Sequence, residues 1–297
     1  MSNRFRVSHR TEYRYTNPVI DGFTMAHLLP RATPSQELVR ADLVIDPPPD
    51  ELAETIDQFG NRVVRFAIHH FHDCLSIEAV SEVVHTPRLY DGEHPTWESV
   101  AETIATSTGT IALEVAPFAA ESPRAALAPE LDELTRPVFL PGRSIIDVVI
   151  DLCHTIFREF QFDAGFSDVT TPVGAVVAAR RGVCQDFAHV AVAALRSKGL
   201  AGRYISGYIE TYPPPGQPKL IGVDASHAWA SAWFPGFGWL EFDPTNDQIP
   251  PQNHVTIAWG RDYGDVAPVR GVVIGPAVDQ ALTVEVDVQR VPAVAGA

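Results

Sequence analysis

The feature that most constrains the fold of this chain is a change in its hydrophobic period. From residue 4 to residue 15 the odd positions are mostly apolar or aromatic and the even positions are polar, which predicts a half-buried strand. Residues 38–45, 62–71 and 75–85 repeat the pattern, and turn-forming residues at Pro47-Pro48-Pro49 and Gly60-Asn61 separate them. Roughly the first 90 residues therefore predict an antiparallel sheet or β-sandwich.

The period becomes helical in the middle of the chain. Residues 96–135 are rich in Ala, Glu and Leu, and prolines divide them into short helices that resemble a connector. Ser144 is the expected N-cap of a longer helix, with Asp147 three residues on and an apolar stripe that continues to Phe160. Residues 180–199 predict a second helix that ends at Gly199.

A period of two returns after this helix. Residues 202–211, 227–234 and 238–243 predict strands, and the last two form a hairpin through residues 235–238. Residues 282–288 alternate once more and predict a further half-buried strand. Strands, helices and strands in this order favour an α+β fold.

The charge of the chain excludes two classes of partner. The 297 residues include 22 Lys and Arg against 37 Asp and Glu, so the net charge is −15. A field of that sign repels phosphate backbones and anionic lipid, and we expect neither nucleic acid nor a membrane surface as a partner.

The cysteines indicate the compartment. Cys74, Cys153 and Cys184 form an odd and sparse set, which argues against a disulfide framework and for a reducing compartment or one working thiol. Residues 1–19 lack the apolar run of a signal peptide, and no stretch has the length of a membrane span. We therefore expect a cytoplasmic protein.

Cys184 is the candidate nucleophile. It is expected at the start of the second helix, where unpaired backbone N–H groups and the helix dipole stabilise a thiolate. A lone cysteine is more often a buried structural residue, so the assignment needs a base nearby. His189 follows five residues later, which puts it about 140° around the helix from Cys184 and excludes it as that base.

The predicted hairpin supplies a better base. His227 opens its first strand and Asp243 closes its second, with the turn near their midpoint, so the two can lie opposite or diagonally opposite. Facing side chains of a sheet come within about 5 Å of each other, which allows carboxylate and imidazole to hydrogen-bond. Cys184, His227 and Asp243 thus supply a nucleophile, a base and the group that orients the base.

Several motifs in order resemble the transglutaminase-like superfamily of papain-like cysteine enzymes, in its bacterial branch with an N-terminal β-domain. They are Arg181-Gly-Val-Cys-Gln-Asp-Phe-Ala-His189, Gly202-Arg-Tyr-Ile-Ser-Gly-Tyr208, Asp224-Ala-Ser-His-Ala-Trp229 and Gly238-Trp-Leu-Glu-Phe-Asp-Pro-Thr-Asn246, with further matches in residues 11–19, 260–263 and 265–271. By this resemblance the family's nucleophile falls on Cys184, its histidine on His227 and its aspartate on Asp243. Phe162 departs from the family, which commonly has a tyrosine there.

Together with the change of period, the resemblance implies a domain organisation, with the following expected boundaries. Residues 1–90 form the N-terminal β-rich domain, an antiparallel β-sandwich, and residues 91–142 form the helical connector. Residues 143–297 form the transglutaminase-like catalytic domain, with a C-terminal return strand. The backbone N–H of Cys184 is a natural oxyanion donor, and Asp186 complements the helix dipole rather than acting as a catalyst.

The implied activity is attack on an amide bond of a peptide or protein substrate through a Cys184 thioester, with no metal or organic cofactor. Water as the acyl acceptor makes the protein a peptidase or amidase, which we favour, and an amine makes it a protein-glutamine transamidase. The rival of another class is a catalytically idle protein that binds peptides. Residues 212–216 are one loop expected to shape substrate choice, and the sequence leaves the oligomeric state open.

Two other groups of residues carry weaker hypotheses. His70, His72 and Cys74 alternate along a predicted strand, a spacing compatible with zinc, although no fourth ligand is evident. Trp229, Trp233, Trp239 and Trp259 gather around the expected site. They are more typical of the core of a small sheet, although Trp229 is a candidate substrate contact in an aromatic wall that excludes water.

Overall fold

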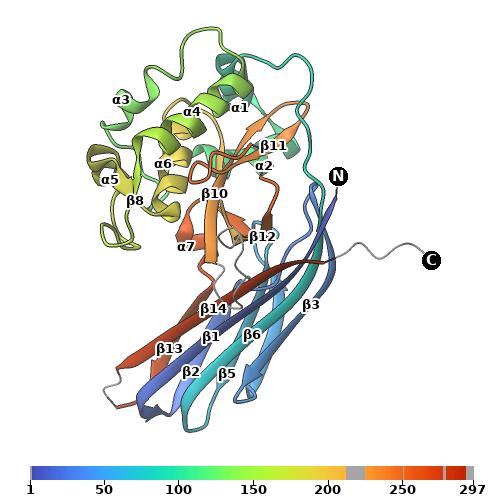
Figure 1. Cartoon of the computed structure of the whole chain (residues 1–297), viewed down its shortest axis with the longest axis vertical. Helices are drawn as coiled ribbons and strands as arrows, with labels where there is room; N and C mark the ends of the chain where they lie inside the picture. The colour runs from blue at the N-terminus through green and yellow to red at the C-terminus, as the bar shows by residue number, and fades with distance from the viewer. Residues whose placement is uncertain (1, 212–224, 250, 277–278, 292–297) are drawn as a thin grey trace, which may run out of the picture.

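The protein consists of a β-sandwich and a mixed region of helices and sheet, which are drawn one below the other in Figure 1. The computed structural model describes residues 2–211, 225–249, 251–276 and 279–291. The loop at 212–216 and Asp224 of the third motif lie outside the described residues. In the described ranges no helix has the length and apolar character needed to cross a membrane.

The sandwich contains two four-stranded antiparallel sheets, in the orders β14-β1-β6-β3 and β13-β2-β5-β4. Its strands are β1 (Asn3–Val19), β2 (Asp21–Ala26), β3 (Gln36–Asp46), β4 (Glu51–Ile56), β5 (Arg62–Ile68), β6 (His72–His85), β13 (Val269–Ile274) and β14 (Gln280–Val291). Apolar side chains such as Tyr15, Phe66 and Ile77 pack between the sheets, as the alternating pattern predicts. The sequence missed β2, β4 and β13, and every residue of β4 is exposed, which leaves no alternation to detect there.

The mixed region packs helices around a third antiparallel sheet, in the order β11-β10-β9-β12. Its strands are β9 (Gly202–Ile209), β10 (Ala225–Phe234), β11 (Gly238–Phe242) and β12 (His254–Gly260), and a short parallel pair joins β7 (Gln161–Phe162) to β8 (Arg181–Gly182). Its helices are α1 (Trp97–Thr106), α2 (Gly109–Ala119), α3 (Leu131–Thr135), α4 (Ile145–Glu159), α5 (Val173–Ala179), α6 (Cys184–Arg196) and α7 (Tyr263–Val266). The α+β class and the N-terminal β-sandwich are as the sequence predicts.

Helix α6 is the central helix of this region and packs against β9 and β10. Its residues from Phe187 to Leu195 are buried without exception, so it is enclosed on all sides rather than amphipathic. Gly202 permits the close approach, because a Cβ there would lie 3.2 Å from the Leu195 side chain and 3.3 Å from the Val192 backbone. Helix α4 starts at the expected N-cap, where the Ser144 hydroxyl accepts a hydrogen bond from the Asp147 N–H.

The last strands differ from their expected place. Strand β14 pairs with β1 and strand β13 pairs with β2, so the C-terminal return strand belongs to the sheets of the sandwich. The expected boundary placed all of 143–297 in one catalytic unit. Alternation in residues 282–288 predicts a strand, but it carries no information about which strand is its partner.

Two side-chain amides join the sandwich region to β12, an edge strand of the central sheet. Gln36 donates from Nε2 to the Thr256 carbonyl at 2.7 Å and accepts from the Thr256 N–H at 2.9 Å. Asn61 does the same at Trp259, donating to the carbonyl at 2.8 Å and accepting from the N–H at 3.0 Å. Each side-chain amide thus forms with β12 the two hydrogen bonds that a residue of a neighbouring strand would form.

Candidate active site

Cys184 is the first residue of α6, as the sequence predicts. The preceding turn is held by Asp186, whose carboxylate accepts hydrogen bonds from the Val183 N–H at 2.8 Å and from the Ser167 hydroxyl. Gly182 leaves room for that carboxylate, because a Cβ at this position would lie 2.8 Å from the Asp186 Oδ2. Asp186 therefore caps the helix and fixes the position of the cysteine.

Exposure distinguishes Cys184 from Cys153. Cys184 is partly exposed, whereas Cys153 is buried and its Sγ donates to the Asp243 carbonyl at 3.4 Å. Burial also raises the pKa of the Cys153 thiol far above its usual value. At Cys184 the first N–H groups of α6 have no partner inside the helix, and they favour negative charge on the sulfur.

The register of the hairpin brings His227 and Asp243 together. Ala230 of β10 pairs with Phe242, the last residue of β11, so Asp243 follows the last paired step and lies diagonally across from His227. The His227 Nε2 and the Asp243 Oδ2 are 2.8 Å apart. The predicted proximity of the two side chains is present, in its diagonal form.

Asp243 accepts hydrogen bonds from five donors and is 0% exposed. Its Oδ2 lies 2.8 Å from the His254 Nε2 and 2.7 Å from the Asn246 Nδ2, in addition to His227. Its Oδ1 accepts from the backbone N–H groups of Thr245, at 2.9 Å, and Asn246, at 3.3 Å. Burial raises the pKa of Asp243, but the hydrogen bonds from the two histidines outweigh it and hold the pKa well below its ordinary range.

His227 connects Asp243 to Cys184. Its Nε2 lies 2.8 Å from the Asp243 Oδ2, and Cys184 is close enough to act on the charge of the imidazole. Burial lowers the pKa of His227, but the hydrogen bonds to Asp243 and Cys184 and their charges outweigh burial and raise it to about 10. The site therefore favours a charged imidazole beside the sulfur.

His254 and Asn246 are site residues that sequence reasoning missed as such. His254 begins β12, which neighbours β9 rather than the β10–β11 hairpin, so its approach to Asp243 follows only from the strand order. Burial lowers the pKa of His254, which favours a neutral ring with the Nε2 proton directed at Asp243. Asn246 lies inside a quoted motif, three residues after Asp243, and an Asx turn of this kind was a detectable signal.

Trp229 lies behind His227 and not at a surface. The tryptophan is 0% exposed, its indole N–H donates to the Glu241 Oε2 at 2.9 Å, and its ring stacks on the imidazole of His227 at 6.0 Å between centroids. Its expected role as a substrate contact is therefore not possible in this arrangement. Gly207 of β9 pairs with His227, and a Cβ at Gly207 would lie 2.6 Å from the Trp229 ring.

The other candidate residues have structural positions. His189 is buried against the Tyr204 ring at 4.7 Å, and its Nε2 accepts from the Tyr263 N–H, which agrees with its exclusion as the base. Trp233 is buried, and Trp239 and Trp259 line a pocket that does not include Cys184. Phe162 is 57% exposed on β7, which pairs with β8 two residues before Cys184.

The zinc hypothesis for His70, His72 and Cys74 is not supported by the geometry. His70 lies in the turn between β5 and β6 and faces Asp50, whereas His72 is buried against Tyr15, and the ligand atoms of the three do not form a set with metal-binding spacing. Among the described residues the one set with ligand spacing is His227, Asp243 and His254. In this set the Asp243 carboxylate already hydrogen-bonds to both imidazoles, as expected for a carboxylate that orients a histidine.

Comparisons with known proteins identify the family of the chain. A model of the bacterial transglutaminase-like N-terminal region matches residues 5–84, and a model of the transglutaminase-like superfamily matches residues 133–244. The uncharacterized protein Rv2569c of Mycobacterium tuberculosis is 38% identical over 294 residues, covering 97% of this chain and 93% of its own.

Two further proteins are similar at lower identity or over a shorter range. The crystal structure of a candidate cysteine protease from Cytophaga hutchinsonii has a TM-score of 0.75 at 19% identity, over 99% of this chain and 92% of that one. A protein-glutamine gamma-glutamyltransferase of Pseudomonas aeruginosa is 35% identical over 72 residues, which are 24% of this chain and 11% of that protein. The near full-length match to the mycobacterial relative and the two family models together show that this chain belongs to the transglutaminase-like superfamily.

Proposed function

We propose that the protein is a cysteine peptidase or amidase in which Cys184, His227 and Asp243 form the catalytic triad. The observation that supports this most strongly is the pairing of His227 with the buried Asp243 carboxylate at 2.8 Å, together with the interaction with Cys184 that helps to raise the pKa of the imidazole. A purely structural role does not explain this arrangement. The fold maintains a buried negative charge beside a histidine that lies next to a partly exposed thiol, and burying such a charge costs free energy.

In the proposed reaction the Cys184 thiolate attacks the carbonyl carbon of an amide. The carbonyl π electrons move to oxygen, where the N–H of Cys184 is one donor. When the C–N bond breaks, the proton on His227 goes to the leaving amine and a thioester remains on Cys184. Neutral His227 then takes a proton from water, which attacks the thioester and releases the acid, while Asp243 keeps the ring oriented.

Water is proposed as the acyl acceptor rather than an amine. Transfer to an amine requires a site that excludes water, and the tryptophans are the natural material for such a site. Trp229 and Trp233 are buried, however, and Trp239 and Trp259 line a different pocket. In the part of the chain that the structure describes, none of these tryptophans forms a channel above Cys184.

The test is mass spectrometry of a peptide library incubated with the protein, with and without a primary amine. We expect hydrolysed products in both samples and none with Cys184→Ala. Cys74→Ala, a change at another partly exposed cysteine, is the matched control and retains activity. Amine incorporation that exceeds hydrolysis at millimolar amine would replace the peptidase or amidase with a transamidase.

A second measurement separates an enzyme from an idle peptide-binding protein. Iodoacetamide labels thiolates, so we expect rapid stoichiometric labelling of Cys184 at pH 6 that is lost in His227→Ala. Equal and slow labelling of both proteins, together with no turnover of any library member, favours the binding protein.

A further inference from the structure

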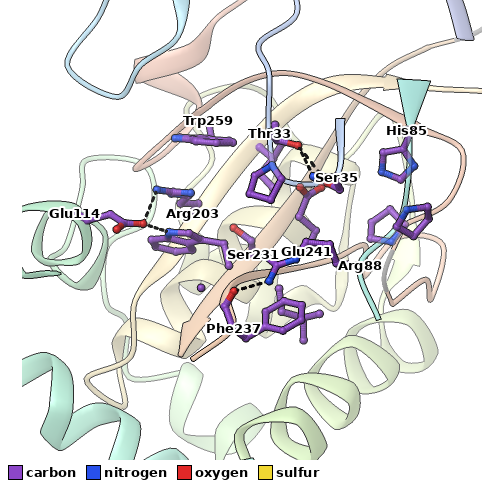
Figure 2. Close-up of a pocket in the computed structure, with 17 residues that line it drawn as sticks. Thr33, Ser35, His85, Arg88, Glu114, Arg203, Ser231, Phe237, Glu241 and Trp259 are labelled. Carbon is purple, nitrogen blue, oxygen red and sulfur yellow. Dashed lines mark hydrogen bonds and ion pairs between the residues drawn. The ribbon is translucent and has the colours of Figure 1, made fainter. Parts of the chain in front are cut away.

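A pocket of about 240 Å³ lies on the central sheet, where the sheet meets the segments that leave the sandwich. One wall consists of β9, β10 and β11 residues, and the other includes Thr33, Ser35, His85 and Arg88, as Figure 2 shows. Cys184, His227 and Asp243 are not among its lining residues. The pocket is therefore separate from the proposed triad.

Arg203 is the anomaly of this pocket. The residue is 7% exposed, yet its guanidinium donates no hydrogen bond to any described residue. The nearest carboxylate among them is that of Glu114, at 3.9 Å, beyond hydrogen-bond distance, and the charge of Glu241 also acts on the guanidinium. A guanidinium has five N–H donors, and burying them without acceptors costs free energy unless something supplies the acceptors.

Aromatic rings stack on the guanidinium of Arg203 without accepting hydrogen bonds from its N–H groups. Its Cζ lies 3.7 Å from the centroid of Trp239 and 4.2 Å from that of Trp259, and Figure 2 shows Trp259 above it. Such stacking fixes the plane of the group and leaves its N–H edge unused. Burial lowers the pKa of Arg203 to about 9 and the charge of Arg31 lowers it further, because the charges of Glu114 and Glu241 offset these effects only in part.

The neighbours of Arg203 also have unused polar atoms. Ser231 pairs with Arg203 across β10 and β9, so the two side chains share a face of the sheet. Ser231 is 1% exposed, and its hydroxyl has no partner among the described residues. The indole N–H of Trp259, another lining residue, is also without one.

The two acids of the pocket, by contrast, already have donors. Glu114 accepts from the Trp239 indole N–H at 3.0 Å, and Glu241 accepts from the Trp229 indole N–H at 2.9 Å. Burial raises the pKa of Glu241, which weakens its negative charge. The pocket therefore lacks hydrogen-bond acceptors for its N–H and O–H groups, rather than donors for its carboxylates. A bound cation would not supply these acceptors.

We propose that this pocket binds a small organic carboxylate, with its carboxylate on Arg203 and Ser231 and its apolar body against Ile205, Leu240 and Trp239. Guanidinium groups bind carboxylates through paired hydrogen bonds, and a serine hydroxyl can donate a third. The apolar walls and the volume, which is below the roughly 300 Å³ of sites for drug-sized molecules, select a small ligand.

The test is isothermal titration of the wild-type protein with three probes of one shape and different charge: benzoate, benzamide and benzylamine. We expect benzoate to bind at least tenfold more tightly than either of the others. Equal affinities for all three, or no binding of benzoate, would overturn the proposal and leave Arg203 solvated by water alone. This comparison needs no variant and does not depend on the proposed peptidase activity.

Two variants locate the site. Arg203→Gln should weaken benzoate binding at least tenfold, whereas Arg40→Gln, on the exposed surface of β3, should leave it unchanged. Ser231→Ala removes a hydroxyl that has no described partner, so it should fold normally and still weaken binding. Benzoate affinity that is unaltered in both Ser231→Ala and Arg203→Gln places the anion elsewhere and contradicts the proposal.

Discussion

At the scale of single residues, the site is organised around one buried carboxylate. Asp243 has no contact with water, so its charge is stabilised only by the five donors that converge on it. Two of those donors are imidazoles with opposite pKa directions, His227 raised and His254 lowered. In the proposed reaction His227 therefore carries the proton that is transferred, while His254 keeps its proton and donates a hydrogen bond to Asp243.

Asp243→Asn should slow turnover by about 10⁴-fold, the loss that the same change causes in a Ser-His-Asp triad. The amide has almost the same shape, but it removes the negative charge and cannot accept from both histidines through one oxygen. Steady-state kinetics on a peptide found in the library screen measures the effect. Asp247→Asn in the same loop is the control, and a loss below tenfold for Asp243→Asn would contradict the assigned role.

Stability should depend on pH through His227. Its pKa is about 10 in the folded protein against 6.5 ordinarily, so folding favours the protonated ring. That contribution is fully present below about pH 6.5 and is lost as the pH rises towards about 10.

Urea unfolding of the wild type across this range should show a falling free energy of unfolding, with a smaller fall in His227→Asn. Identical slopes for the two proteins would show that His227 is not protonated in the native state.

Residue by residue, the sequence indicated the three residues of the proposed triad but not their surroundings. Cys184, His227 and Asp243 could be found because a helix start and a short hairpin place them through local geometry. His254 could not, because it reaches Asp243 only through the position of β12 beside β9, a long-range pairing. Trp229 was assigned to the substrate because sequence alone does not show which face of β10 is covered.

At the scale of elements, close approach between backbone and side chains positions β10, the strand that carries His227. Gly207 of β9 pairs with His227, and the ring of Trp229 occupies the space where a side chain at 207 would lie. Trp229 in turn stacks on His227. The small residue on one strand thus determines where the imidazole of the next strand can rest.

Gly207→Ala should therefore destabilise the protein by about 1–3 kcal/mol, the usual cost of overpacking, and lower activity as well. Its Cβ would lie 2.1 Å from the Val255 carbonyl oxygen and 2.6 Å from the Trp229 ring. Chemical denaturation measures the first effect and peptide turnover the second. Gly22→Ala in β2 is the matched control, because its Cβ would have only ordinary contacts, at 3.9 Å. Equal stability of the two variants would contradict the steric argument.

At the scale of the whole molecule, the sandwich region supports the central sheet through Gln36 and Asn61. Their amides satisfy backbone groups of β12 on the side where no strand of its sheet pairs with it. Edge strands with free backbone groups are sites of aggregation, and here side chains from a distant part of the sequence protect one. This support was invisible in the sequence, because a single glutamine at position 36 has no pattern to reveal its partner.

Gln36→Ala should cost about 1–3 kcal/mol for each buried group left without a partner, and Thr256 has two. The free energy of unfolding from urea denaturation measures this cost. Gln289→Ala, on the exposed surface of β14, should change it little. A Gln36→Ala protein as stable as the control would mean that β12 does not rely on the amide.

The pairing of β1 with β14 and of β2 with β13 also has a consequence for biosynthesis. The ribosome releases the chain from its N-terminus, so β1 emerges long before the strand that lies beside it. The sheet that contains β2 cannot be completed until β13 ends at residue 274, and the sheet that contains β1 cannot be completed until β14 ends at residue 291. The segment that contains Cys184, His227 and Asp243 is by then fully translated, so a nascent chain can carry all three residues before the sandwich closes.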